Sequence, residues 1–445
     1  MEAYLAHIRR AGSAEQTVPE HLRRVGDLMA EFAAGIGLSA TAHLIGLLHD
    51  LGKCTREFAD YLAYCRQNPD DHSRRGTVDH ASAGGQLLRR RYGAHSEEEQ
   101  LAADMAALVI FSHHSGLMNY VDKKGCADFL RRVEKDDLLE RVDLAYYYRE
   151  VIGEEALDRL FAEVVGEFSA LDARIESCAS EETENYHFAW GMVHKLLFSM
   201  LVDADRLDSV EFEMDVRLTQ EWHTEMLWGE FSVNLEKKLK SFPMPQKETA
   251  KKIAGLRQKI SDDCLGAAQN APGIYKLSVP TGGGKTLAGM RFALRHAQLY
   301  GKKRIIFVIP YTSIIEQNAK EIRDIFGRDE AILEHHSNVL PEDIAGEDSE
   351  STDWRRLLTE RWDVPVIFTT QVQFLNALFA GDGSSMRRLH ALEDSILIFD
   401  EIQTLPVRCT HLFNAAMNFL QSFCRVTAVL CTATQPPLER MECPL

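Results

Sequence analysis

The spacing of apolar residues divides the chain into two parts of different character. Up to about residue 240, apolar residues recur at three- and four-residue intervals, which predicts helices. The clearest segments are HLRRVGDLMAEFAAGIG, TAHLIGLLHDLGK, LAADMAALVIFSHHSG and FAWGMVHKLLFSMLVDADRLDS. Short stretches with glycine or proline separate these segments, as is typical of turns between helices. The first part is therefore predicted to be an all-α domain.

Short β-branched runs replace this pattern after residue 240. SFPMPQKETAKK contains two prolines followed by charged residues, which predicts a linker or a domain edge. Beyond it, the runs IYKLSV, RIIFVIP, VPVIFTT, SILIFDE and VTAVLCTAT alternate with helical patterns. Apolar strands that alternate with helices indicate a parallel sheet covered on both faces. We therefore predict a multidomain chain, with an all-α domain over residues 1–240 and an α/β parallel-sheet domain over residues 241–445.

Composition narrows the class of protein. The chain has no run of 18 apolar residues and no signal-peptide pattern, so we expect no membrane span and a cytoplasmic location. The nine cysteines form no CxxC pair, which argues against a zinc finger and for reduced thiols. The formal net charge of -17 argues against a protein that passively coats DNA. It is compatible with an enzyme that uses a local basic track or bound metal ions.

Histidines and aspartates recur along the predicted helices of the first domain. The candidate metal ligands are His21, His49, Asp50, His80, His113, His114 and Asp205. Neutral imidazole and carboxylate are ligands that divalent first-row metals accept, and such a site takes manganese, iron, cobalt or nickel. His49 and Asp50 would point about 100° apart on a helix, so each could serve one of two metal ions or one could bridge them. Two metal ions could clamp a phosphodiester and generate hydroxide at neutral pH.

A lone histidine beside an apolar face is more often a core or surface residue than a ligand. We place His7, His43, His72, His95, His194 and His223 in that class. The string LLHDLGK is more specific, because it puts a metal-binding pair, a glycine and Lys53 close together. Lys53 could bind the scissile phosphate or its developing charge. His49, Asp50 and Lys53 are therefore the candidate catalytic residues of this domain.

The order of HLIGLLHDLGK, DHAS, HHSG and VDADRLDS, with His21 upstream, resembles the HD superfamily over residues 15–210. The resemblance implies that His21, His49, Asp50 and Asp205 hold one metal ion. It implies that Asp50, His80, His113 and His114 hold or approach a second. Asp203 and Asp208 stand near Asp205, and alignment with the final aspartate of the family favours Asp205.

The segment SVPTGGGKT, residues 278–286, follows an apolar strand and precedes a helical pattern, as a phosphate-binding loop does. The expected nucleotide-binding residues are Thr281, Gly282, Gly283, Gly284, Lys285 and Thr286. The glycines would let backbone N–H groups close around the phosphates of ATP, Lys285 would reach the β- and γ-phosphates, and Thr286 would ligate magnesium. In SILIFDEIQ, Asp400 would hold magnesium and Glu401 would act as the general base.

Both segments resemble motifs of superfamily 2 helicases, which implies a RecA-like lobe. CTATQP, with Thr432 and Thr434, resembles the motif that couples hydrolysis to movement. Residues 307–319 and 368–379 resemble motifs Ia and Ib, which line the nucleic-acid groove. Gln258 lies where an adenine-sensing segment would stand, and is a candidate nucleotide contact.

An HD domain followed by a first RecA-like lobe resembles the CRISPR-associated type I helicase-nucleases, and the DEIQ motif is similar to the type I-C branch. The resemblance implies an enzyme of CRISPR interference. A crRNA-guided surveillance complex, Cascade, would open an R-loop and recruit it. The enzyme would nick the displaced single-stranded DNA, translocate with ATP and degrade the DNA. A second RecA-like lobe is not among these residues, so we expect ATP binding with weak hydrolysis and no unwinding of duplex.

Three alternatives stay open at this point. The HD site could be a phosphohydrolase for small nucleotides, which a comparison of nucleotide and DNA turnover would decide. The chain could be an ATP-dependent nucleic-acid remodeller with an inert HD scaffold, which an absence of bound metal would support. It could also be a binding module that docks on a partner, which activity in isolation would exclude.

Overall fold

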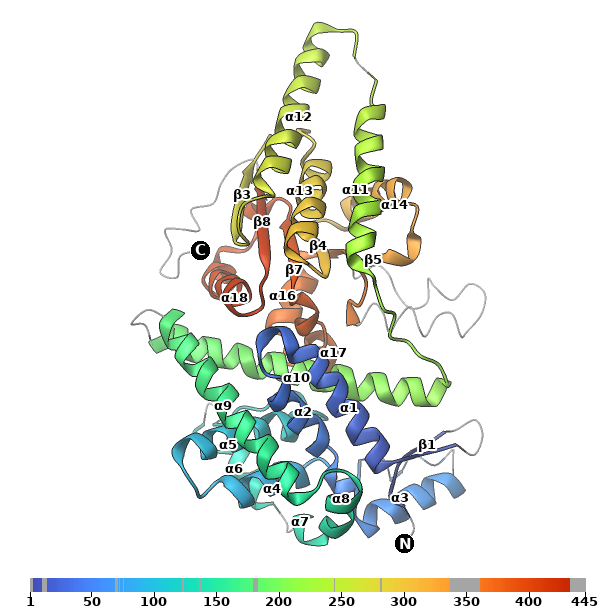
Figure 1. Cartoon of the computed structure of the whole chain (residues 1–445), viewed down its shortest axis with the longest axis vertical. Helices are drawn as coiled ribbons and strands as arrows, with labels where there is room; N and C mark the ends of the chain where they lie inside the picture. Colours follow the sequence, from blue (N-terminus) through green and yellow to red (C-terminus); the bar gives the residue numbers. More distant parts are fainter. Residues whose placement is uncertain are drawn as a thin grey trace. The chain divides into compact units, whose positions relative to one another are not determined.

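The structure is a computed structural model, and it describes residues 3–432 except 10–13, 69–70, 72, 75, 122–123, 136–137, 179–182, 244, 281 and 337–360. The chain forms two compact units, and most of their helices and strands are labelled in Figure 1. Unit 1 comprises Met1–Thr219 and Gly381–His390, and unit 2 comprises Gln220–Ala380 and Ala391–Leu445. Among the described residues, no helix combines the length and the apolar character needed to cross a membrane.

Unit 1 is helical, as the apolar spacing predicted, and a small antiparallel hairpin precedes its first helix. Its strands are β1 (Leu5–Ile8) and β2 (Glu15–Thr17). Its helices are α1 (Val18–Ala33), α2 (Ser39–Leu48), α3 (Arg56–Gln67), α4 (Ala83–Tyr92), α5 (Glu97–Ser112), α6 (Asp128–Glu134), α7 (Leu138–Arg141), α8 (Leu144–Glu150), α9 (Glu154–Cys178), α10 (Thr183–Met214) and α17 (Gly383–Met386).

Two glycines allow α1 and α2 to cross at close range. A Cβ atom added to Gly46 would lie 2.6 Å from the Cα atom of Gly26, so no larger residue fits at this crossing. His21 precedes Gly26 on α1, and His49 follows Gly46 at the end of α2. The crossing therefore brings the two histidine rings together, with their centroids 5.1 Å apart.

Unit 2 contains a six-stranded parallel sheet with the order β3-β8-β7-β4-β6-β5. Its strands are β3 (Ile274–Ser278), β4 (Arg304–Ile309), β5 (Ile332–His335), β6 (Val366–Thr370), β7 (Ser395–Phe399) and β8 (Thr427–Thr432). Its helices are α11 (Thr224–Ser241), α12 (Glu248–Ala267), α13 (Lys285–Tyr300), α14 (Thr312–Phe326), α16 (Gln371–Phe379) and α18 (Thr410–Phe423). This is the predicted α/β architecture of a RecA-like lobe.

Helices cover both faces of this sheet. On one face, Gly289 of α13 packs against Ile398 of β7, because a Cβ atom at Gly289 would lie 3.6 Å from the Ile398 side chain. The next residue of β7, Phe399, points to the opposite face. There its ring contacts Phe374 of α16 and Phe413 of α18, at centroid distances of 5.0 and 5.3 Å. Burial on both faces explains why every residue of β7 is apolar except the first.

The two compact units divide the chain at a different residue from the predicted domains. The first stretch of unit 1 ends at Thr219, and the domain boundary at residue 240 stays a prediction. Helix α11 belongs to unit 2, because the ring of Phe231 stacks on Phe326 at 3.9 Å and Trp228 donates a hydrogen bond to the Lys302 carbonyl at 2.8 Å. The apolar spacing of α11 predicts a helix, but it cannot reveal which core that helix joins. The proline-containing stretch after α11 separates it from α12 instead of separating two domains.

A short segment from the second half of the chain also belongs to unit 1. Residues Gly381–His390 leave unit 2 after α16 and return to it before β7. Arg387 of this segment donates a hydrogen bond from Nε to Oδ1 of Asp203 on α10, at 2.5 Å. Both side chains are completely buried. Unit 2 is therefore not contiguous in sequence, and the contact between Arg387 and Asp203 helps to join Gly381–His390 to unit 1.

Candidate metal centre and nucleotide-binding loop

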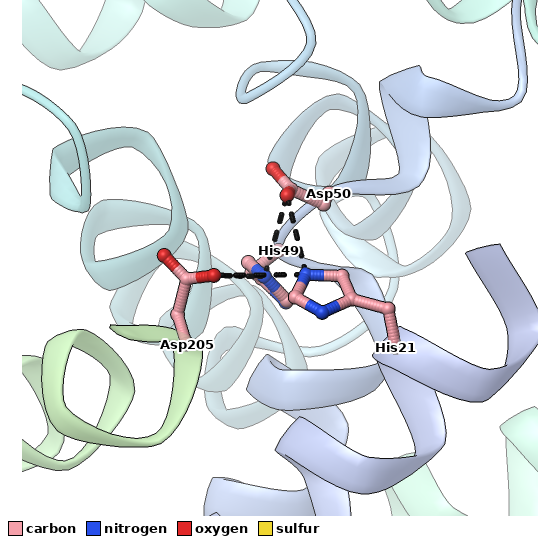
Figure 2. A group of neighbouring side chains, drawn as sticks. All are labelled: His21, His49, Asp50 and Asp205. Atoms are coloured by element: carbon pink, nitrogen blue, oxygen red, sulfur yellow. Dashed lines mark ion pairs between the residues drawn. The ribbon is translucent and has the colours of Figure 1, made fainter. Parts of the chain in front are cut away.

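The first group of candidate ligands gathers at the crossing of α1, α2 and α10 (Figure 2). It consists of His21, His49, Asp50 and Asp205. Asp50 Oδ2 lies 3.5 Å from Nε2 of both histidines. Asp205 Oδ1 lies 3.6 Å from Nε2 of His21 and 3.7 Å from Nε2 of His49. Both carboxylates therefore face the same two imidazole nitrogens.

These distances fit a shared metal ion better than direct hydrogen bonds. Two ligand atoms at about 2.1 Å from one tetrahedral ion lie roughly 3.4 Å apart, and the observed separations are only slightly longer. Nε2 of His21 and Nε2 of His49 are buried, and within the described chain neither finds a hydrogen-bond partner. Buried polar atoms normally have partners, so two such atoms aimed at two carboxylates indicate a place for a cation. The donor set of imidazole and carboxylate suits a divalent transition metal.

A second group lies on the other side of Asp50. It consists of Asp50, His80 and His114. Asp50 Oδ1 lies 3.8 Å from Nε2 of His80 and 4.0 Å from Nε2 of His114. His113 lies outside this group of three, but its Nε2 atom is 3.3 Å from the same oxygen. Asp50 thus turns one oxygen toward each group, as a bridging carboxylate would.

The turn after α2 places Asp50 between the two groups. The sequence indicated a continuous helix through His49 and Asp50, but α2 ends at Leu48. His49 keeps helical angles, whereas Asp50 has φ -116° and ψ 28° and precedes a 3-10 turn over Leu51–Lys53. The two side chains therefore diverge because the backbone leaves the helix, and not because of helical periodicity alone.

Burial and charge shift the pKa values of the acidic ligands. Desolvation raises the pKa of Asp50, but Lys53 and His49 outweigh it and hold that pKa well below its usual value. Desolvation also opposes ionisation of Asp205, and the adjacent His49 side chain lowers its pKa nevertheless. Both carboxylates are therefore ionised at neutral pH and available as ligands.

The outer histidines are kept neutral. Desolvation lowers the pKa of His80, and desolvation together with His113 lowers the pKa of His114 to about 4. A neutral imidazole has a free lone pair, which is the form that binds a metal. His113 behaves differently: desolvation lowers its pKa, but Asp50 outweighs this and raises it.

Lys53 points into the site and not toward solvent. Its Nζ atom lies 2.8 Å from Asp50 Oδ2 and 3.3 Å from Nε2 of His7, and the residue is only 4% exposed. In this arrangement Lys53 balances part of the charge of Asp50. Contact between Lys53 and a scissile phosphate stays a prediction. His7 was placed among histidines without a role, yet it accepts a hydrogen bond from this lysine.

The three aspartates of VDADRLDS have different surroundings. Asp203 pairs with Arg387, and Asp205 faces the first group. Asp208 contacts the far side of the His21 ring, where its Oδ2 atom lies 2.6 Å from Nδ1. Of the three, only Asp205 faces the first group, and its role as a ligand stays a prediction. The contact of Asp208 was not anticipated, because its partner lies on α1, far away in the sequence.

The predicted phosphate-binding loop of unit 2 connects β3 to α13. Gly282 and Gly284 have φ values of 79° and 82°, which L side chains rarely adopt. A Cβ atom at Gly283 would clash with Val279. Lys285 is the first residue of α13, and Thr286 follows it, half-buried. Thr281 lies outside the described residues.

The three segments predicted as helicase motifs meet at one edge of the sheet. Strands β3, β8 and β7 are neighbours and parallel, so the loop after β3, Thr432 at the end of β8 and Asp400 after β7 lie at their carboxyl ends. Ligands of open parallel sheets bind at this edge. Thr432 donates a hydrogen bond to Gln403 at 2.5 Å, and Gln403 donates one to Glu401 at 2.5 Å. A polar chain therefore links the ends of β8 and β7. Thr434 lies outside the described residues.

Lys285 is paired with the two acidic residues. Its Nζ atom donates a hydrogen bond to Glu401 and lies 3.5 Å from Asp400 Oδ1. Desolvation lowers the pKa of Lys285, but these carboxylates outweigh it and raise it. Desolvation raises the pKa of Asp400, whereas the hydrogen bond from Lys285 lowers the pKa of Glu401. This arrangement would allow Lys285 to leave the carboxylates of Glu401 and Asp400 and bind a nucleotide phosphate.

Gln258 is exposed on α12 and donates a hydrogen bond to Asp262 at 3.0 Å. The neighbouring Arg257 instead contacts the loop, because its Nε atom donates to the Gly282 carbonyl at 2.8 Å. A nucleotide contact by Gln258 stays a prediction. The sequence offered no signal for Arg257, since helical spacing does not tell which of two adjacent polar residues faces the loop.

Comparison with known proteins assigns a domain type to each half. The HD domain family matches residues 18–150, and the DEAD/DEAH box helicase family matches residues 246–441. Over 193 residues, the chain is 32% identical to the CRISPR-associated nuclease/helicase Cas3 of Haloferax volcanii. That alignment covers 40% of this chain and 21% of the Haloferax protein.

Solved structures share the fold at low sequence identity. The structure of T. fusca Cas3 with ATP matches 97% of this chain and 49% of its own, with a TM-score of 0.58 and 14% identity. The ADP form matches 98% and 51%, with a TM-score of 0.56 and 14% identity. This chain therefore spans about half the length of these structures. The two domain types are in keeping with use of a metal ion and of ATP.

Proposed function

Because this chain is a Cas3-like HD–helicase protein, we propose that it is a CRISPR-associated nuclease whose metal centre cleaves DNA and whose helicase lobe binds ATP. The proposed DNA is the single strand displaced by a crRNA-guided surveillance complex, Cascade. That part of the proposal is supported by the relationship to Cas3. The part that concerns cleavage is supported by the metal centre itself.

One observation carries the proposal of a metal-dependent enzyme. Four buried or half-buried ligand atoms, Nε2 of two histidines and one oxygen of each of two aspartates, lie within 4.8 Å of one another. The candidate ligands of this first metal ion are His21, His49, Asp50 and Asp205, and those of a second are Asp50, His80, His113 and His114. Divalent ions such as manganese, cobalt, nickel or iron would polarise the phosphate and supply a hydroxide nucleophile at neutral pH.

The exposure of the second group indicates where a phosphodiester would approach. The side chains of His21 and His49 have no exposed surface. The side chains of His80 and His114 are 20% and 49% exposed. A polymeric substrate can reach only atoms open to solvent, so the second group would face the DNA. His114 could then contact a phosphate oxygen or hold a proton near the leaving group.

The helicase lobe would bind Mg-ATP at the edge formed by β3, β8 and β7. Lys285 would exchange Glu401 for the phosphates, and Thr286 and Asp400 would hold magnesium. Glu401 would then be free to accept a proton from the attacking water.

The test is cleavage of circular single-stranded DNA by the purified chain without ATP. Reactions contain manganese, cobalt, nickel or magnesium, or EDTA. The Asp50→Ala variant removes the carboxylate shared by both groups. The matched control is Asp60→Ala, which removes an exposed carboxylate from α3. We expect cleavage with a transition metal, none with EDTA, loss in Asp50→Ala and wild-type activity in Asp60→Ala.

Other outcomes would redirect the proposal. Turnover of free deoxynucleotides with DNA left intact would favour a small-nucleotide phosphohydrolase. Metal binding without cleavage of either substrate would refute an autonomous nuclease, and addition of a surveillance complex with an R-loop would then test a recruited one. A folded chain that binds none of the four metals would favour an inert HD scaffold.

A further inference from the structure

Two aspartates of helix α10 lie at opposite edges of the His21 ring. On α10, Asp205 Oδ1 lies 3.6 Å from Nε2 of His21, on the side of the metal centre. One turn later on α10, Asp208 Oδ2 lies 2.6 Å from Nδ1 of the same ring. Asp208 is outside both groups of candidate ligands. Its contact with His21 has no role in the function proposed above.

The acceptor behind His21 differs from those behind His49, His80 and His113. His49 Nδ1 donates to the carbonyl of Gly46 at 2.8 Å, and His113 Nδ1 donates to the carbonyl of Ile110 at 2.7 Å. His80 Nδ1 donates to the carbonyl of Val78 at 3.0 Å. These acceptors are neutral backbone groups of nearby residues. His21 instead donates to a carboxylate from another helix.

A second side chain holds Asp208 in place. Gln16 Nε2 donates a hydrogen bond to the same oxygen, Asp208 Oδ2, at 2.9 Å. Gln16 is 8% exposed and Asp208 is 5% exposed, so water competes little for this contact. Gln16 lies in β2 and immediately precedes Thr17, the N-cap residue of α1. The hairpin therefore fixes Gln16 at the start of the helix that carries His21.

We propose that Asp208, oriented by Gln16, is a positioning residue that sets the metal affinity of His21. A carboxylate that accepts a hydrogen bond from Nδ1–H of His21 fixes the tautomer whose Nε2 lone pair faces the metal centre. The negative charge behind the ring also makes Nε2 a stronger donor to a metal. The inference rests on the proposed function, because it assumes that His21 binds a metal ion.

The test is a titration of the metal-free chain with Mn²⁺, followed by the electron paramagnetic resonance signal of the free ion. Asp208→Asn keeps the size of the side chain and removes its charge. The matched control is Asp215→Asn, the same change at an aspartate whose side chain is 80% exposed beyond the end of α10. We expect Asp208→Asn to weaken binding at one site by about 10- to 100-fold. We expect Asp215→Asn to bind as the wild type does.

The Gln16→Ala variant distinguishes a positioning role of Asp208 from a role of Asp208 in folding. Since Gln16 acts through Asp208, we expect a smaller loss of affinity in Gln16→Ala and no added loss when it is combined with Asp208→Asn. The thermal unfolding of the metal-free chain is measured for each variant. A role in positioning predicts lower affinity with little change in the metal-free melting temperature.

The outcomes are distinguishable. Wild-type affinity in Asp208→Asn would overturn the positioning role and leave the proposed metal centre intact. If Asp208→Asn unfolds early while Gln16→Ala binds Mn²⁺ as the wild type does, Asp208 has only a structural role and the inference fails. If the wild-type chain itself binds no Mn²⁺ or other divalent transition metal, the proposed function fails instead.

Discussion

Replacing Arg387 by methionine would remove the positive partner of a buried aspartate. Arg387 belongs to the segment that unit 1 receives from the second half of the chain. Its Nε atom lies 2.5 Å from Oδ1 of Asp203, and both side chains have no exposed surface. Methionine keeps most of the volume of the arginine stem. The variant would therefore leave the buried Asp203 carboxylate without its contact to Arg387.

Removal of one partner from a buried ion pair costs about 3–5 kcal/mol. His390 remains near Asp203, with Nε2 3.4 Å from Oδ2, and can supply part of the lost charge. We therefore expect the lower end of this range, about 3 kcal/mol of unfolding free energy. In a unit of this size each kcal/mol lowers the melting temperature by about 2–4 °C, so the expected decrease is roughly 6–12 °C.

Differential scanning calorimetry would measure this decrease in melting temperature. Hydrogen exchange would show whether the backbone amides that exchange faster in the variant lie in α10. Arg206→Met is the matched control, because Arg206 lies on the same helix and donates to Ser384 of the same segment at an exposed site. We expect the control to change stability by no more than about 0.5 kcal/mol. Adding Asp203→Leu to Arg387→Met removes both charges and should restore most of the loss. An Arg387→Met chain that melts at the wild-type temperature would refute the reasoning.

Three other predictions concern the two sites and the core of unit 2. Lys285→Met should weaken Mg-ATP binding by about 10-fold or more, as measured by calorimetric titration. Lys259→Met changes an exposed residue of α12 and should leave Mg-ATP binding unchanged. Equal Mg-ATP affinities of the two variants would contradict the role assigned to Lys285. Gly52→Ala would force a methyl group against the carbonyl of His80, so we expect the number of tightly bound Mn²⁺ ions to fall from two to one; an unchanged number would argue against the second group. Burial raises the pKa of Glu393 from its ordinary value of 4.5 to about 7, so the folded chain binds a proton that the unfolded chain releases. The contribution of Glu393 to the free energy of unfolding is therefore fully present below pH 4.5. It is lost as the pH rises through 7, and the loss is up to about 3 kcal/mol. Glu393→Gln should melt like the wild type near pH 4.5 and higher at pH 8, and a difference that does not depend on pH would exclude this cause.

The local fold could be predicted from the sequence wherever one segment carries its own signal. Apolar runs such as SILIFDE predicted buried parallel strands, and β7 is buried along its full length. The loop before Lys285 was predicted because positive φ angles, a preceding strand and a following helix are all encoded within one short stretch. The candidate ligands were found from residue types, and the structure brings their atoms together. That they bind metal stays a prediction.

Contacts between distant segments could not be predicted in this way. The partner of Asp203 stands at residue 387, and the acceptor behind His21 stands at residue 208. A single sequence records which residues can form such pairs but not which of them meet. Assignment of α11 to unit 2 has the same cause, because Phe231 and Phe326 meet only in the folded chain.

The division of Asp50 between two groups has a consequence for how the centre fills. Oδ2 faces Nε2 of His21 and His49, while Oδ1 faces the imidazoles of the other group. An ion held by one oxygen withdraws charge from the other oxygen and fixes its direction. If both positions bind an ion, occupancy of either would change the metal affinity of the other, and this linkage would be reciprocal. The two positions would not saturate as independent equilibria, so a metal dose–response would report a coupled pair and not two intrinsic constants.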